Sequence, residues 1–131
     1  MIRNAIFTAL FLLFAAGGAG AAEVRPFTLD ALHEAQAAGK PILVDVHADW
    51  CPTCRAQEPA LKAIEADPAF AKLVVMVLDF DSQKQEEKAL GVRSQSTLIA
   101  FAGKEETRRS VGITDPSAIR DLAASALAAA K

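Results

Sequence analysis

Short, nearly continuous apolar runs alternate along this chain with stretches whose apolar residues recur at helical spacing. The runs at 42–47, 73–80 and 97–102 are rich in valine, leucine and isoleucine, a composition typical of strands buried on both faces of a sheet. A glycine turn at 103 and the stretch 107–111 follow the third run and predict a hairpin. The apolar pattern therefore predicts a sheet of four strands.

Four further stretches carry the helical pattern, at 30–38, 54–66, 82–89 and 114–130. Thr28 is the expected N-cap of the first, and Pro59 should kink the second. Ser82 is the expected start of a capping box for the third, which Gly91 closes. The order of elements predicts a single α/β domain, with a central mixed four-stranded sheet flanked by helices on both faces.

The first 22 residues have the pattern of a secretory signal peptide. Arg3 gives a positive start, and the apolar segment 6–16 that follows is too short to span a bilayer comfortably. Small residues precede a cleavage point after Ala21 or Ala22, which leaves a folded domain at 23–131. An uncleaved membrane anchor is the alternative, disfavoured because no long apolar extension follows.

Charge and cysteine content narrow the choice of function. The net charge is −2 and the basic residues are scattered, so nothing predicts a nucleic-acid partner. The chain has two cysteines, Cys51 and Cys54, and both lie in the sequence WCPTC between a predicted strand and a predicted helix. Because export leads to an oxidising compartment, this pair is free to form a disulfide.

The start of a helix suits Cys51 as an attacking thiol. Unpaired N–H groups and a partial positive charge stabilise a thiolate there, so we expect Cys51 to be reactive and exposed. Cys54 lies one turn further on and is placed to resolve a mixed disulfide.

Two other interpretations of the pair are weaker. A structural zinc site needs four ligands, and only His33 and His47 remain, of which His47 is expected to point away from the motif. A purely structural disulfide is also disfavoured, because closing so short a loop stabilises a fold only slightly. We therefore predict a reactive pair and no metal site.

Asp45 is the other informative residue, because it interrupts an apolar strand. Burial of a carboxyl group raises its pKa toward neutrality. Since Asp45 precedes Cys51 by six residues, it is a candidate acceptor for the proton of Cys54. The alternative is a carboxylate that reaches solvent at a strand end.

The stretch 42–59 (ILVDVHADWCPTCRAQEP) resembles the active-site region of the thioredoxin family. The resemblance continues through Asp81, 91–93, 97–98, the turn at 103 and Gly112, and covers nearly all of the predicted mature domain. It implies a thioredoxin-like fold in which Cys51 is the nucleophile, Cys54 the resolving thiol and Asp45 the buried base.

Three positions depart from that family pattern. The dipeptide Pro52-Thr53 replaces the Gly-Pro of reducing thioredoxins, and Val77 stands where a lysine often accompanies the aspartate. Ser96 stands where the family has a cis-proline, so the peptide bond before it is either trans or held cis by the fold. We expect this serine to alter the substrate groove and to uncover Cys51. The expected groove residues are Trp50, Pro52, Thr53, Gln95, Ser96 and Thr97.

Together these features predict an exported thiol–disulfide oxidoreductase that exchanges disulfides with protein thiols, without a cofactor. We expect a separate redox partner to recycle it, a periplasmic rather than secreted location, and no stable membrane insertion after cleavage. The alternative is a non-catalytic binding protein of the same fold, such as a copper carrier that uses the cysteine pair. The sequence leaves open whether the pair oxidises or reduces its substrates.

Overall fold

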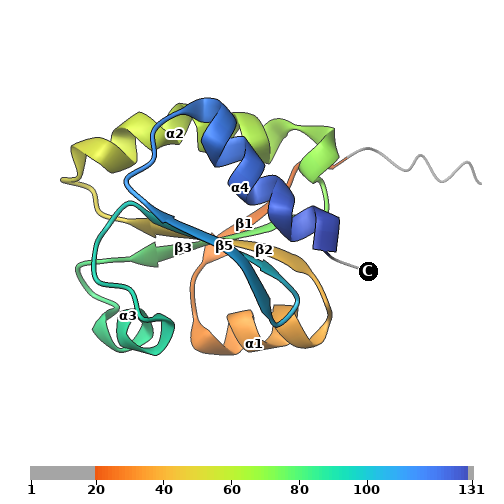
Figure 1. The fold of residues 1–131 in the computed structure, drawn as a ribbon. Helices are drawn as coiled ribbons and strands as arrows, with labels where there is room; N and C mark the ends of the chain where they lie inside the picture. The colour runs from red at the N-terminus through yellow and green to blue at the C-terminus, as the bar shows by residue number, and fades with distance from the viewer. Residues whose placement is uncertain (1–19, 130–131) are drawn as a thin grey trace, which may run out of the picture.

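The computed structural model describes residues 20–129, so most of the predicted signal peptide lies outside the described residues (Figure 1). Its helices are α1 Leu29–Ala37, α2 Pro52–Ala66, the short 3₁₀ helix η1 Pro68–Phe70, α3 Lys84–Leu90 and α4 Pro116–Ala129. Its strands are β1 Glu23–Pro26, β2 Pro41–His47, β3 Val74–Asp79, β4 Thr97–Ala102 and β5 Glu105–Val111. None of the helices described is long and apolar enough to cross a membrane.

The strands form one mixed sheet in the order β1-β3-β2-β4-β5. Strand β3 runs parallel to both β1 and β2, whereas β4 is antiparallel to β2 and to β5. Helices α2 and α4 cover one face of the sheet, and α1 and α3 lie on the other (Figure 1). The predicted α/β architecture, a mixed sheet with helices on both faces, is therefore confirmed.

Strand β2 lies at the centre of this sheet and contributes to two cores. Its residues Ile42, Val44 and Val46 pack with α1 residues such as Leu32, while Leu43 packs on the opposite face with residues of α2 and α4. Burial on both faces explains why this strand is almost continuously apolar. It also means that Asp45, on the same face as Leu43, points toward α2.

The sheet has five strands, so the prediction of four was wrong in number. The missed strand is β1, which pairs in parallel with β3 at the edge of the sheet. Its sequence, EVRP, is mostly exposed and shows no alternation of apolar and polar residues. Pro26 is tolerated because an edge strand has one side without ladder hydrogen bonds. No periodic signal marks such a short, polar strand.

Local signals at the first helix behaved as expected. The Thr28 hydroxyl accepts a hydrogen bond from the Ala31 amide at 3.0 Å, so the predicted N-cap is confirmed.

The turn after β4 needs glycine for two reasons: Gly103 has φ 57°, and a Cβ there would lie 3.3 Å from the Cα of Gly39. The close approach of the two turns at this end of the sheet therefore depends on the glycine at 103.

Candidate active site

The two cysteines lie where β2 leads into α2, as predicted, and they form a disulfide with a Cα–Cα distance of 5.3 Å. Helix α2 begins at Pro52, two residues earlier than expected, which makes Cys51 its N-cap. The Cys51 Sγ accepts a hydrogen bond from the Cys54 amide at 3.0 Å. Proline has no backbone N–H that would be left without a partner at the first helical position, and it therefore suits the start of this helix. The first turn of α2 thus directs a backbone donor at the first sulfur.

Both sulfurs are buried, which corrects the expectation that Cys51 would be exposed. Cys51 is 0% exposed and Cys54 is 3% exposed, and both pack with Ala48 and the half-buried Phe80. The Ser96 hydroxyl lies 3.5 Å from the Cys51 Sγ and covers it from the opposite loop. Replacing the family's proline by serine has therefore not uncovered the cysteine.

The loop that carries Ser96 adopts one of the two conformations that the sequence left open. All peptide bonds of residues 20–129 are trans, and Ser96 has φ 59°, the left-handed region. A left-handed conformation costs a non-glycine residue roughly 1–2 kcal/mol. Tertiary hydrogen bonds offset that cost, because the Ser96 amide donates to Val46 O at 2.9 Å and the Ser96 carbonyl accepts from the Gly112 amide at 2.9 Å.

Gln57 is a site residue that the sequence did not reveal. It is 0% exposed on α2, and its Nε2 donates to Ser96 O at 3.2 Å and to Ile113 O at 2.8 Å. Both neighbours are carbonyl oxygens, so the NH₂ end of the amide must face them. Gln57 thus ties α2 to the Ser96 loop and to the segment after β5. The available signal was its spacing of three residues from Cys54, which places both on one helix face.

Asp45 and Cys54 line the same cavity, of about 160 Å³, beneath the start of α2. Asp45 is 8% exposed, and this burial raises its pKa from 3.8 to about 6, while the nearby His47 partly opposes the rise. A carboxyl group with such a pKa accepts a proton readily near neutral pH. The complete lining is Val24, Asp45, His47, Cys54, Glu58, Leu61, Lys62, Glu65 and Val77.

The position of His47 corrects another expectation. His47 was expected to point away from the motif, but it lines this cavity together with Asp45 and Cys54. Two residues separate Asp45 from His47 along β2, so the pleat places both on the same face, and that spacing was the signal. The His47 Nε2 lies 3.2 Å from the Asp49 Oδ1.

The departure at Val77 has a structural counterpart. Val77 lies directly opposite Asp45 in the parallel register of β2 and β3, so the side chain adjacent to the carboxyl is apolar. The cation near this cavity comes instead from α2, where Lys62 lines the wall and lowers the pKa of Asp45 slightly against the larger effect of burial. Burial therefore dominates the titration of this carboxyl.

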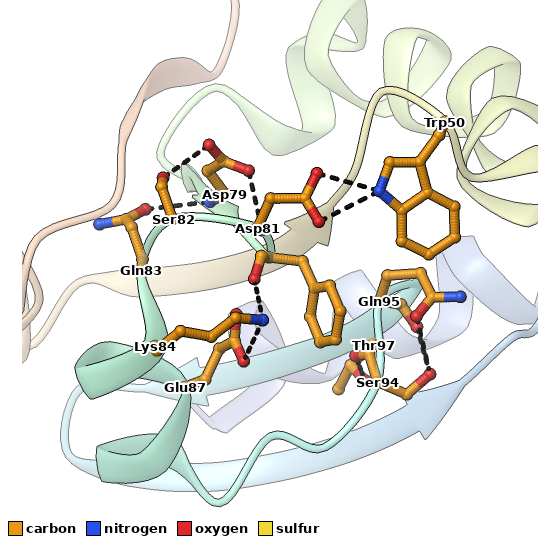
Figure 2. Close-up of polar contacts among 11 residues, drawn as sticks. Trp50, Asp79, Asp81, Ser82, Gln83, Lys84, Glu87, Ser94, Gln95 and Thr97 are labelled. Carbon is orange, nitrogen blue, oxygen red and sulfur yellow. Dashed lines mark hydrogen bonds and ion pairs between the residues drawn. The ribbon is translucent and has the colours of Figure 1, made fainter.

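Trp50 forms the exposed wall of the motif and is held from the loop after β3. It is 52% exposed, and its Nε1 donates to both carboxylate oxygens of Asp81, at 3.1 and 2.9 Å (Figure 2). Asp79 supports that loop, and the hydrogen bond from the Ser82 hydroxyl lowers the pKa of Asp79. Since Ser82 points back to Asp79, the predicted capping box is wrong, and Gln83 is the N-cap of α3.

The predicted groove residues divide into an exposed and a buried set. Pro52 is exposed, and Thr53 and Gln95 are partly exposed. Ser96 and Thr97 are buried beneath them, at 4% and 2% exposure. The Thr97 hydroxyl donates to Ser94 O at 2.7 Å, and Ser94 in turn bonds Gln95 (Figure 2). Of the predicted groove residues, those at the surface are therefore Trp50, Pro52, Thr53 and Gln95.

The described residues contain no group of three or more histidine, cysteine, aspartate or glutamate side chains arranged to hold a metal ion. The arrangement provides a disulfide at a helix start, a buried carboxyl that shares a cavity with the second cysteine, and a hydroxyl 3.5 Å from the first sulfur. Such a set is suited to thiol–disulfide exchange, in which one sulfur attacks and the other needs a proton acceptor.

Comparisons with known proteins point the same way. The family profile described as thioredoxin matches residues 24–125. Trxlp from Edwardsiella tarda is 46% identical with a TM-score of 0.73, over 76% of this chain and 96% of that one. A thioredoxin variant from Halobacterium salinarum is 30% identical with a TM-score of 0.68, over 83% and 95% of the two chains. The thioredoxin of Chlamydia muridarum is 35% identical over 60% of this chain and 74% of its own length.

Proposed function

This chain belongs to the thioredoxin family and is a thiol–disulfide oxidoreductase with Cys51 and Cys54 as its redox pair, and from that premise we propose that it works outside the cytoplasm on protein disulfides. The observation that carries the proposed chemistry is the placement of Asp45 and Cys54 on one cavity, with Cys51 at the start of α2. Thioredoxins exchange disulfides with protein thiols and are recycled by a reductase.

In the reducing direction, the Cys51 thiolate attacks one sulfur of a substrate disulfide and forms a mixed disulfide, and the other substrate sulfur leaves as a thiolate. Cys54 then gives its proton to Asp45 and attacks the Cys51 Sγ. This step closes the Cys51–Cys54 disulfide and releases the second substrate sulfur as a thiolate. Two electrons pass from the protein to the substrate, and the reverse sequence oxidises a substrate dithiol.

A separate reductant or oxidant regenerates the pair. One relative, from Mycobacterium leprae, is described as a bifunctional thioredoxin reductase/thioredoxin, so that protein has both functions in one chain. We assign the recycling role here to a separate protein. The direction of electron flow follows from the reduction potential of the Cys51/Cys54 couple against that partner.

The activity is tested by turbidity of insulin during its reduction, with dithiothreitol as the electron source. The wild-type protein should accelerate insulin precipitation, and Cys51→Ser should abolish the acceleration. Cys54→Ser should trap mixed disulfides that migrate more slowly on non-reducing gels. Full activity in Cys51→Ser would rule out the proposed chemistry.

We also propose that residues 1–21 are removed on export and that Ala22 becomes the first residue. Ala22 is 8% exposed within the core between the sheet and α2, and its amide donates to Glu65 O at 2.9 Å. Cleavage after Ala22 would remove a residue that packs in this core, so cleavage after Ala21 is favoured of the two expected points. N-terminal sequencing of the protein from a periplasmic extract tests this, and an intact Met1 in the membrane fraction would overturn it.

A further inference from the structure

We propose that the Ser96 hydroxyl donates a hydrogen bond to the Cys51 thiolate and that Gln57 positions this hydroxyl. Together Ser96 and Gln57 then stabilise the reduced state of the two cysteines. The inference rests on the proposed role of Cys51 as the attacking thiol. The Cys51 sulfur then has a second donor besides the Cys54 amide in the first turn of α2, and the loop before β4 takes part in the redox chemistry.

The geometry around the Cys51 Sγ carries the first step. The sulfur has the Cys54 amide at 3.0 Å on one side and the Ser96 Oγ at 3.5 Å on the other. Cys51 and Ser96 are 0% and 4% exposed, so bulk water competes little for either group. Within residues 20–129, the Cys51 sulfur is the one hydrogen-bond partner of this hydroxyl. A buried hydroxyl directed at a sulfur is thus part of the site.

The strength of this contact depends on the redox state of the sulfur. A disulfide sulfur is a weak acceptor, whereas a thiolate is charged and accepts strongly from a hydroxyl. Reduction of the disulfide adds two electrons, and at a pH where Cys51 stays ionised the pair takes up one proton, on Cys54. The Ser96 donor therefore stabilises the product of reduction more than the disulfide and raises the reduction potential of the couple.

Gln57 holds this donor in place through the backbone of Ser96. Its amide bonds Ser96 O at 3.2 Å and Ile113 O at 2.8 Å, and it lies on the same helix that starts at the disulfide. Ser96 has φ 59° and is the one non-glycine residue with positive φ among the described residues. The Gln57 bridge is one of the contacts that keep the serine in this unusual conformation, with its hydroxyl at the sulfur.

The test measures two quantities for each variant: the equilibrium of the Cys51/Cys54 pair with glutathione, and the pH at which half of Cys51 is thiolate, followed by thiolate absorbance near 240 nm. Hydrogen bonds to charged groups predict a shift of about tenfold in the equilibrium when the hydroxyl is removed. A tenfold change corresponds to a potential lower by about 30 mV. The titration midpoint of Cys51 should rise by about one pH unit.

Two variants separate the hydroxyl from the backbone conformation. Ser96→Ala and Ser96→Gly both remove the hydroxyl, but glycine adopts positive φ without strain. If the hydroxyl is the cause, both variants shift the potential and the midpoint in the same direction by similar amounts. Ser94→Ala removes a hydroxyl of the same loop that bonds Gln95 instead, and it should leave both quantities unchanged. Wild-type values in Ser96→Ala and in Ser96→Gly would overturn the proposal.

Gln57→Leu tests the positioning role with a side chain of similar size. We expect a smaller shift of the midpoint in the same direction as Ser96→Ala, and little further shift when the two substitutions are combined. A loss of stability with an unchanged midpoint would show that Gln57 is only structural and would overturn its part of the proposal. Insulin reduction by the wild type is measured alongside, so a failure of the proposed function is distinguished from a failure of the Ser96 assignment.

Discussion

Replacing the buried carboxyl at Asp45 with an amide should stabilise this protein at neutral pH while impairing its chemistry. Asp45 is 8% exposed and lies on the α2 side of β2, where burial raises its pKa from 3.8 to about 6. The folded chain therefore binds this proton more tightly than the unfolded chain does. Asp45→Asn keeps the shape of the side chain and removes the charge.

The sign and size of the effect follow from proton linkage. Well below pH 3.8 the carboxyl is protonated in both states, so its burial adds no charge penalty. Between 3.8 and about 6 the unfolded chain loses the proton while the folded chain keeps it, and above about 6 the folded chain must bury a charge. A rise of about two pH units in the pKa corresponds to about 3 kcal/mol of lost stability above pH 7.

Urea unfolding of the oxidised protein, followed by circular dichroism from about pH 3 to about pH 8, measures this difference. The free energy of unfolding of Asp45→Asn should nearly equal that of the wild type at about pH 3 and exceed it by about 3 kcal/mol at about pH 8. Asp30→Asn makes the same chemical change at an exposed position of α1 and should show no gain with pH. A difference between wild type and Asp45→Asn that stays constant across this range would refute the reasoning.

The same substitution should slow the closing of the disulfide. Without the buried Asp45 carboxylate, Cys54 loses its proposed proton acceptor, and loss of general-base assistance typically slows a step by roughly a hundredfold or more. The lifetime of a mixed disulfide between Cys51 and a chromogenic thiol, measured by stopped flow at pH 7, tests this. Glu58→Gln removes a carboxylate at the rim of the same cavity and is the matched control, expected to change the lifetime little. An unchanged lifetime in Asp45→Asn would contradict the role of Asp45.

Three smaller changes have defined outcomes. His47→Gln removes a group that lowers the pKa of Asp45, so that pKa should rise above about 6 in a carboxyl titration by NMR, and an unchanged or lower value would contradict the electrostatic assignment. Thr28→Ala deletes the N-cap of α1 and should lower the free energy of unfolding by about 1 kcal/mol, measured by urea unfolding with Thr53→Ala as the comparison. Asp81→Ala leaves the indole of Trp50, the only tryptophan, without its acceptor, so fluorescence anisotropy should fall, whereas Asp81→Asn should retain most of it.

The sequence predicted the elements whose signals are local or periodic. The buried runs became β2, β3 and β4, the Thr28 cap formed, and the two cysteines lie at the start of α2. Burial of Asp45 followed from one charged residue in an apolar strand, and its pKa is raised as expected. These features depend on neighbours close in sequence or on strand periodicity, which the amino-acid order contains.

The features that were missed depend on contacts between distant segments. Strand β1 is short and polar, and it forms because β3 offers an open edge. Gln57 resembles a solvent-exposed helix residue until the loop before β4 and the segment after β5 supply its carbonyl partners. The burial of Cys51 depends on Ser96, which lies 45 residues further along the chain. No pattern in the sequence near Cys51 or Ser96 indicates that these two residues are in contact.

The two cysteines of the disulfide lie near opposite kinds of group, hydrogen-bond donors for one and a proton acceptor for the other. Cys51 is surrounded by donors, the Cys54 amide and the Ser96 hydroxyl, which hold a negative charge. Cys54 lines the same cavity as Asp45, whose pKa is raised by burial and which is the proposed acceptor of the Cys54 proton. This asymmetry predicts independent effects: Ser96→Ala should shift the potential but leave the pH dependence of stability of the oxidised protein unchanged, because Cys51 does not titrate in the disulfide. Asp45→Asn should do the reverse at pH values below the ionisation of Cys54. If one substitution moved both quantities, the two sides of the site would be coupled through the disulfide rather than separate.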